Sequence, residues 1–276
     1  MFTPVLSALS CFMPQSVFGL DTLFYPCPFK AGVRSGYIDS RPENPQDHLA
    51  AKEAILIENL MLFLKYYNER ILLEFLQHLK IIGVSIPISI LVSVPIGIYI
   101  SSRPRIAKIV IYIAGILMTI PSLALFGIMV VSFAPWGLGL GMVPAVTAIT
   151  IYSLLPITRN TYTALNSVPA GVLEAAKGMG FSKRQTLWKI RIPLSIPVIM
   201  AGVRTSVVLG VSVATFATLV GAGGLGYFIF SGISRSNFAM VLAGAVLVSA
   251  LGIGVNWFFM QLEIWLTPRG LRVGRK

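Results

Sequence analysis

The stretch that decides the fold is residues 174–193, EAAKGMGFSKRQTLWKIRIP, a basic segment between two apolar runs that can each cross a bilayer. Ser182 and Gln185 have the spacing of a capping box, which begins a helix, and Gly180 just before them can end a preceding helix. Pro193 is expected to stop the second helix. The local chemistry therefore predicts two short helices at an angle, in a loop outside the membrane.

The composition is that of an integral membrane protein. Of the 276 residues, 55% are hydrophobic and 12% are charged, whereas an ordinary soluble domain carries about 25% charged residues. The net charge is +12, and the part of the chain after residue 80 holds fifteen of the 22 basic residues but only two of the ten acidic ones, Glu174 and Glu263. Because these basic residues lie between and beside apolar runs, the positive-inside rule explains them, and nucleic acid is not an expected partner.

Apolar runs of about 20 residues predict five membrane spans in an all-α fold, with the N-terminus outside and the C-terminus in the cytoplasm. The run 106–134 is ambiguous, because it is either one long helix or two short helices broken at Pro121. If the loop 160–193 is cytoplasmic, five spans also place the basic cluster 103–108 and the basic tail in the cytoplasm, which six spans would not do. The expected spans are 81–100, 106–134, 143–157, 197–220 and 241–264.

Residues 174–193 resemble the EAA loop of permease subunits of binding-protein-dependent ABC importers. That pattern is EAA, three residues, G, nine residues, I, one residue and LP, and only Ile192 departs from it, in place of Leu. The resemblance implies a MetI-like permease fold and a cytoplasmic loop that docks into a cleft of an ATPase subunit. It implies an ATPase-coupling role for six residues: Glu174, Ala175, Ala176, Gly180, Ile190 and Pro193.

Further segments are similar to the osmoprotectant branch of these importers, which carries glycine betaine, carnitine and choline. They are TIPSLALFG at 119–127, YSLLPITRNTYTAL at 152–165, VRT at 203–205 and GAGGLG at 221–226, and the resemblance covers roughly residues 71–262. It implies a subunit in a bacterial cytoplasmic membrane that forms the translocation pathway with a second copy or a paralogue. The implied partners are an ATPase subunit that uses ATP and Mg, and an external substrate-binding protein. The alternatives are a methionine-type or other small-nutrient importer permease, and a stand-alone osmolyte carrier or channel.

The part before the first span divides into two. Residues 53–80 have helical apolar spacing among charges, which predicts an amphipathic helix at the outer face over 61–80. Residues 1–60 are Pro-rich, irregular and without the basic start of a signal peptide. They are either a loose periplasmic arm or an extension that is not native, with translation beginning at Met61. The remaining expected parts are a permease domain over 81–265 and a basic tail over 266–276.

No enzyme active site is predicted. Past residue 80 the chain has no Asp, His or Cys, so a catalytic triad, a metal cluster or a pair of catalytic Asp residues cannot be assembled there. The chain also lacks GxxxxGK[ST], so hydrolysis of ATP falls to a partner subunit. We expect this chain to bind no metal and no cofactor of its own.

Candidate pathway or gate residues are those that are unusual inside apolar segments. Arg204 is the one charge well inside an expected span, so it either snorkels, pairs between helices or faces the pathway. The glycines at 221–226 match GxGxxG by letter, but they follow a membrane helix and no acidic residue lies about 20 residues further on. A tight reversal near a gate is therefore expected there. The set is Pro121, Asn160, Arg204, Gly221, Gly223, Gly224 and Gly226.

Overall fold

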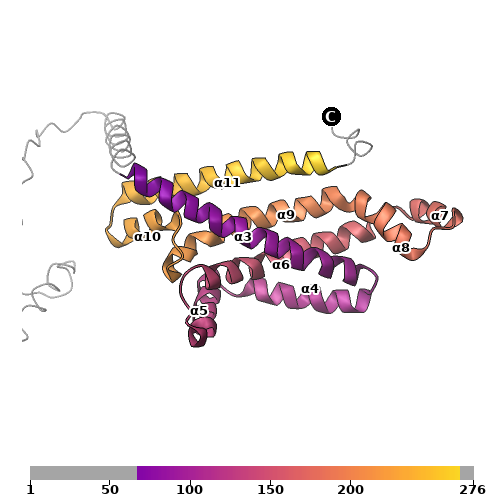
Figure 1. Ribbon diagram of the computed structural model, residues 1–276, viewed down its shortest axis with the longest axis horizontal. Coiled ribbons are helices and arrows are strands. Elements are labelled where there is room, and N and C mark those ends of the chain that lie inside the picture. The colour runs from indigo at the N-terminus through magenta and orange to yellow at the C-terminus, as the bar shows by residue number, and fades with distance from the viewer. Residues whose placement is uncertain (1–66, 268–276) are drawn as a thin grey trace, which may run out of the picture. The chain divides into compact units, whose positions relative to one another are not determined.

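The computed structural model describes residues 67–267, and this part of the chain consists of helices and short connections without a strand. The Pro-rich residues 1–60, the alternative start at Met61 and the basic residues of the tail lie outside the described residues. Figure 1 shows the long helices running side by side in one bundle.

Four helical segments in the described part are long and apolar enough to cross a membrane, and a bent pair makes up to five. The four are α3 (Asn68–Ser101), α6 (Met142–Asn166), the continuous run Lys183–Val220 that contains α9 (Ile192–Ala214), and α11 (Phe238–Leu266). The bent pair is α4 (Pro104–Thr119) and α5 (Ser122–Phe133). This arrangement agrees with the predicted five spans in an all-α fold.

The second span breaks at Pro121. The axes of α4 and α5 differ by 98°, and the backbones of Ile120 and Pro121 are extended, with ψ of 127° and 135°. Pro121 has no N–H to continue α4, and the Tyr152 hydroxyl of α6 donates a hydrogen bond to the Ile120 carbonyl that the break leaves free. The ambiguous run is thus two helices, of which only α4 runs along the bundle (Figure 1).

The first span begins earlier than expected. Residues 68–101 form one helix, so the structure has no boundary near residue 80 between an amphipathic helix and a span. No Gly or Pro lies between residues 68 and 82, and nothing in the backbone therefore interrupts the helix there. The described part of the amphipathic segment is the N-terminal end of α3.

Small residues bring the central helices together. α6 packs most extensively against α3 and α9. A Cβ added at Gly97 of α3 would lie 2.5 Å from Thr161 Cβ, and one added at Gly202 of α9 would lie 2.6 Å from Asn160 Cβ. Such close approach provides the van der Waals contact that joins helices in a membrane. The small buried residues of α3 recur every four positions: Ser85, Ser89, Ser93, Gly97 and Ser101.

The two ends of the bundle carry different connections. Figure 1 shows the short helices α7 (Ala170–Gly178) and α8 (Lys183–Thr186) at the end where α3 and α6 finish, and α10 (Gly226–Ser234) at the opposite end. α11 runs from the α10 end toward the α7 end. This alternation matches the order of crossings expected for five spans.

Candidate functional site

The segment between α6 and α9 folds as two short helices, as predicted. α7 ends at a turn in which Gly180 has φ of +79°. The Gly180 N–H donates to the Lys177 carbonyl and the Phe181 N–H donates to the Ala176 carbonyl, both at 3.0 Å. These two bonds form a Schellman motif, which requires a left-handed residue at the position of Gly180. The prediction that Gly180 ends the first short helix is confirmed.

The capping box that begins α8 is also confirmed. The Gln185 N–H donates to Ser182 Oγ at 3.3 Å, and the Ser182 N–H donates to Gln185 Oε1 at 2.8 Å. Both partners are local, so sequence spacing was sufficient to identify them.

The prediction that Pro193 stops the second helix is wrong. α8 continues through a π-helical turn, Leu187–Arg191, directly into α9, and Pro193 lies in the first turn of α9. The Ile192 N–H donates to the Leu187 carbonyl, five residues back. This wider turn accommodates the proline ring and its missing N–H, which a regular helix tolerates poorly.

The predicted coupling residues lie together on this element but differ in exposure. Glu174 and Ala175 are exposed, Ala176 is fully buried, and Ile190 and Pro193 are half-buried. Two large apolar side chains on the same element are well exposed, Met179 at 68% and Trp188 at 59%. A protruding surface with small, apolar and charged residues is suited to contact with another protein.

The glycine-rich turn at the opposite end of α9 is a tight reversal, as predicted. Gly221, Gly223 and Gly224 have φ of +76°, +76° and +107°. Gly226 begins α10 where a Cβ would lie 2.0 Å from the Thr215 carbonyl oxygen, so only glycine fits there. The left-handed backbone and the close approach are two features that glycine permits and other residues do not.

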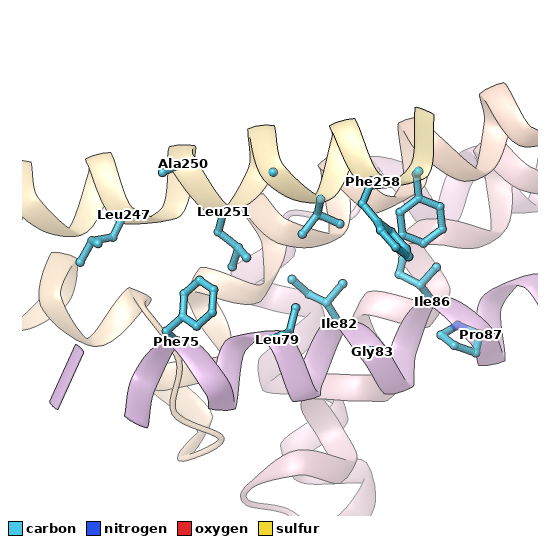
Figure 2. Close-up of a pocket in the computed structure, with 13 residues that line it drawn as sticks. Phe75, Leu79, Ile82, Gly83, Ile86, Pro87, Leu247, Ala250, Leu251 and Phe258 are labelled. Atoms are coloured by element: carbon cyan, nitrogen blue, oxygen red, sulfur yellow. The ribbon is translucent and has the colours of Figure 1, made fainter. Parts of the chain in front are cut away.

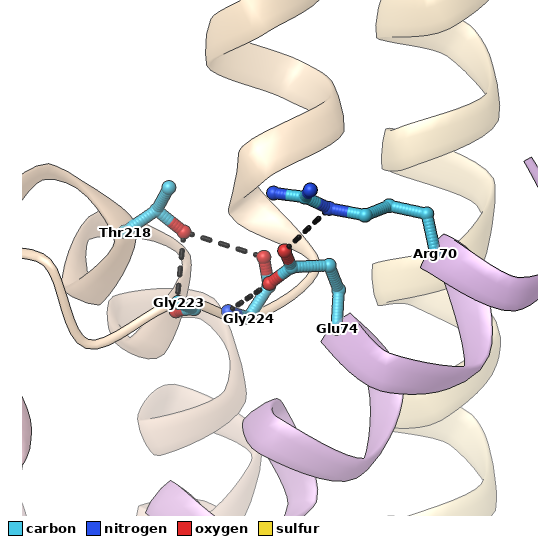
Figure 3. Close-up of polar contacts among 5 residues, drawn as sticks. All are labelled: Arg70, Glu74, Thr218, Gly223 and Gly224. Carbon is cyan, nitrogen blue, oxygen red and sulfur yellow. Dashed lines mark hydrogen bonds and ion pairs between the residues drawn. The ribbon is translucent and has the colours of Figure 1, made fainter.

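Side chains from the N-terminal end of α3 hold this turn, as Figure 3 shows. The buried Glu74 carboxylate accepts a hydrogen bond from the Gly224 N–H at 2.8 Å and another from Arg70 Nε at 3.1 Å. The Arg70 guanidinium also lies 4.4 Å from the centroid of the Tyr227 ring. On the other side of the turn, Thr218 Oγ1 donates to the Gly223 and Gly224 carbonyls.

The next turn of α3 adds a second set of contacts to the same loop. Gln77 Nε2 donates to the Ala222 carbonyl at 2.9 Å, and the Leu225 N–H donates to His78 Nδ1 at 3.2 Å. Because His78 Nδ1 accepts this bond, its proton is on Nε2, which lies 3.2 Å from the Val211 carbonyl. His78 is therefore a buried bridge between α3, α9 and the turn. We call these three residues of α3, Glu74, Gln77 and His78, the α3 clamp.

Arg204 pairs with Glu263 across α9 and α11. The distance between Arg204 Nη1 and Glu263 Oε2 is 3.6 Å, and the side chains are 39% and 2% exposed. Of the alternatives for Arg204, the structure supports the interhelical pair. A carboxylate that is nearly inaccessible is retained in an apolar bundle when a cation is beside it.

The other candidate pathway residues do not converge on one cavity. Pro121 begins α5, while Asn160 lies in the middle of the α6–α9 contact and bonds the Pro156 carbonyl of its own helix at 2.8 Å. Asn160 therefore has a packing position. Arg204 lies inside α9, whereas the glycine-rich turn follows the end of the run at Val220.

An apolar groove of about 710 Å³ lies between α3 and α11 (Figure 2). Its side chains point toward one another from both helices, and none of the lining residues is charged. A groove of this kind offers no charge and no hydrogen-bonding side chain with which to select a polar solute. In Figure 2, Phe75 and Leu247 lie toward one end of the groove, and Pro87 and Phe258 lie toward the other.

Neither the α3 clamp nor the pairing of Glu263 was predicted from the sequence. Glu74, Gln77 and His78 have the i, i+3, i+4 spacing of one helix face, which was a usable signal for a shared polar site. Their partners lie about 150 residues away along the chain, and no local pattern identifies them. The signal for Glu263 was the presence of one isolated acid and one isolated Arg within expected spans.

Comparison with known proteins agrees with this arrangement. Residues 85–266 match the family model of the binding-protein-dependent transport system inner membrane component. The chain is 44% identical to the osmoprotectant import permease protein OsmW of Salmonella typhimurium, over 71% of this chain and 91% of that protein. It is 37% identical to the carnitine transport permease protein OpuCB of Listeria monocytogenes, over 80% and 99% of the two chains. It is also 37% identical to the glycine betaine/carnitine/choline transport system permease protein OpuCB of Bacillus subtilis, over 78% and 97%.

Solved structures show the same fold. A chain of the MetNI methionine ABC transporter in an inward-facing conformation aligns with a TM-score of 0.63 at 22% identity, over 72% of this chain and 97% of that one. An amino acid ABC transporter aligns with a TM-score of 0.58 at 16% identity, over 75% and 96%. With several apolar helices and a family match over most of its length, the protein is a multi-pass membrane protein. The chain belongs to the family of binding-protein-dependent transport system inner membrane components.

Proposed function

We propose that this chain is the transmembrane subunit of an ATP-driven importer for quaternary ammonium osmoprotectants such as glycine betaine, carnitine and choline. The observation that carries the proposal is 44% identity to an osmoprotectant import permease over 91% of that protein. The alternative of a methionine importer permease has only the structural likeness at 22% identity in its favour, which concerns the fold.

The element α7–α8 is the proposed contact with the ATPase subunit, through Glu174, Ala175, Gly180 and their neighbours. Its protrusion from the bundle and its exposed Met179 and Trp188 support this assignment (Figure 1). Because α8 continues into α9 as one helix, force applied to the element reaches the membrane without passing through a flexible loop. A stand-alone carrier or channel has no use for such an element.

Selection of the substrate is proposed to rest with an external substrate-binding protein. In residues 67–267 the buried carboxylates Glu74 and Glu263 each already have a cationic partner, and the α3–α11 groove is apolar. Neither feature leaves an anionic site for a trimethylammonium group. The pathway is proposed to form with a second copy or a paralogue, in a bacterial cytoplasmic membrane with the α7–α8 element in the cytoplasm.

The test is uptake into proteoliposomes that contain the permease, its ATPase and the binding protein. We expect saturable, ATP-dependent uptake of labelled glycine betaine, carnitine or choline, and little uptake when either the ATPase or the binding protein is left out. Labelled methionine serves as the matched competitor. Uptake of methionine in preference to all three compounds, or uptake that does not need the ATPase, would refute the proposal.

A further inference from the structure

Arg191, the last residue of the π-helical turn, holds the end of α6. Its Nε and Nη2 donate to the Leu165 carbonyl oxygen at 3.0 and 2.7 Å, and Nη2 also donates to Asn166 Oδ1 at 3.0 Å. Leu165 and Asn166 are the last two residues of α6. The carbonyls at a helix C-terminus lack partners within the helix and carry partial negative charge, so a guanidinium is a suitable donor there. The planar guanidinium has several N–H donors in fixed directions, so it can donate to both acceptors at once.

This contact joins the two ends of the α7–α8 element. The element leaves α6 through residues 167–169 and returns to the membrane as α9, and Arg191 lies where the return begins. If the Arg191 bonds were absent, the element would be attached to α6 at this end of the bundle through the short chain segment 167–169. Backbone rotations in such a connection can absorb a displacement before it reaches α6.

Packing between α6 and α9 does not replace the contact. The two helices meet where Gly202 lies against Asn160, and Ser206 Oγ of α9 donates a hydrogen bond to the Ser153 carbonyl of α6 at 3.2 Å; both contacts lie deeper along α9 than Arg191. Close packing of small residues resists separation of two helices but permits small sliding movements between them. Hydrogen bonds oppose sliding as well, because their donors and acceptors have fixed directions. At the end of α6 next to the α7–α8 element, the Arg191 guanidinium supplies three such bonds, whereas the Ser206 bond lies deeper in the bundle.

We propose that Arg191 is a positioning residue that makes α6 move with α9 when the ATPase displaces the α7–α8 element. The motion of the ATPase then reaches two spans, α6 and α9. Loss of Arg191 uncouples ATP hydrolysis from import, while the ATPase remains bound. This proposal rests on the proposed function of the element. Arg191 itself does not contact the substrate.

The experiment measures substrate imported per ATP hydrolysed by the complete complex in proteoliposomes. For Arg191→Ala we expect the ATPase to co-purify and to hydrolyse ATP, while the transport-to-hydrolysis ratio falls at least about fivefold, the lower range of coupling between sites. Arg105→Ala is the matched control, because Arg105 is an exposed arginine in the first turn of α4, outside the α7–α8 element, and its substitution removes the same charge. Arg191→Lys keeps the charge but not the fork, so an intermediate ratio is expected.

A wild-type ratio in Arg191→Ala, or an equal loss in Arg105→Ala, would overturn the proposal. If Arg191→Ala does not assemble, Arg191→Lys decides, because a wild-type ratio in that variant contradicts the need for a fork. Absence of ATP-driven import in the wild-type complex overturns the proposed function and this inference together. Normal wild-type import with an unchanged variant ratio overturns the inference alone.

Discussion

Gly180 shows how much a single backbone angle decides in this protein. Its φ of +79° closes the turn between α7 and α8, and no atom lies within 4 Å of the position a Cβ would take. A side chain at residue 180 therefore meets open space, and the cost of substitution comes from the backbone alone. This separates the effect of turn geometry from the effect of lost packing.

Replacing Gly180 by Ala or Val should weaken coupling without preventing membrane insertion. A residue with a Cβ in the left-handed region costs about 1–2 kcal/mol, and a β-branched one costs more. We expect ATPase binding or substrate-stimulated hydrolysis to fall, with Val worse than Ala. Gly178→Ala is the matched control, since Gly178 is helical and equally open. Wild-type transport by Gly180→Val would contradict the docking role of the element.

Gly226 differs from Gly180, because a side chain at residue 226 would meet the backbone of another segment instead of open space. A Cβ there would lie 2.0 Å from the Thr215 carbonyl oxygen, so Gly226→Ala must displace the turn. Overpacking of this kind costs about 1–3 kcal/mol. We expect a lower melting temperature of the purified protein in detergent. Gly115→Ala, in open space on α4, should not lower it, and equal melting of the two variants would contradict the close packing described here.

At the scale of elements, local patterns were predicted well and long-range partners were not. The capping box and Gly180 depend on residues at most a few positions apart, so the sequence identified them. Whether Pro121 kinks or breaks the second span depends in part on the Tyr152 hydroxyl, 32 positions from Ile120. The continuation of α8 past Pro193 depends on a π-helical turn, for which the sequence offered no signal.

The α3 clamp is the element-scale feature with the clearest energetic consequence. Glu74→Ala leaves the buried Gly224 N–H without its acceptor, which costs about 1–3 kcal/mol. We expect the melting temperature to fall and the glycine-rich turn to become more accessible to proteolysis. Glu69→Ala removes the same charge from an exposed site one turn earlier and should change stability by less than about 0.5 kcal/mol. Equal destabilisation by both substitutions would show that the clamp does not hold the turn.

At the scale of the whole molecule, the order of crossings makes a prediction about sidedness. The ends of α3 and α11 lie at the end of the bundle that carries α7 and α8, while the end of α10 lies at the other (Figure 1). The lengths of the apolar runs and the charges of the loops predicted at which end of the bundle each helix ends, because both are properties of whole segments. The positions of individual polar residues inside the bundle did not follow from them.

Single cysteines at Ser102 and Ser234, in a background without Cys11 and Cys27, test this arrangement. Both serines are exposed, so a reagent that reaches their side of the membrane can react. We expect an impermeant thiol reagent to label the cysteine at Ser234 in intact cells and the one at Ser102 only after permeabilisation. Labelling of Ser102 from outside would favour six spans instead of five.

The continuous helical run from Lys183 to Val220, mostly α-helix with a π-helical turn near its start and a 3₁₀ segment at its end, gives the molecule a lever arm. Its 38 residues correspond to about 57 Å at the α-helical rise of about 1.5 Å per residue. If the arm pivots near one end, a tilt of about 5° moves the far end by about 5 Å, close to one helical turn. A slight rocking of the short helices beneath the membrane would therefore shift the glycine-rich turn by a distance comparable to the size of a small solute.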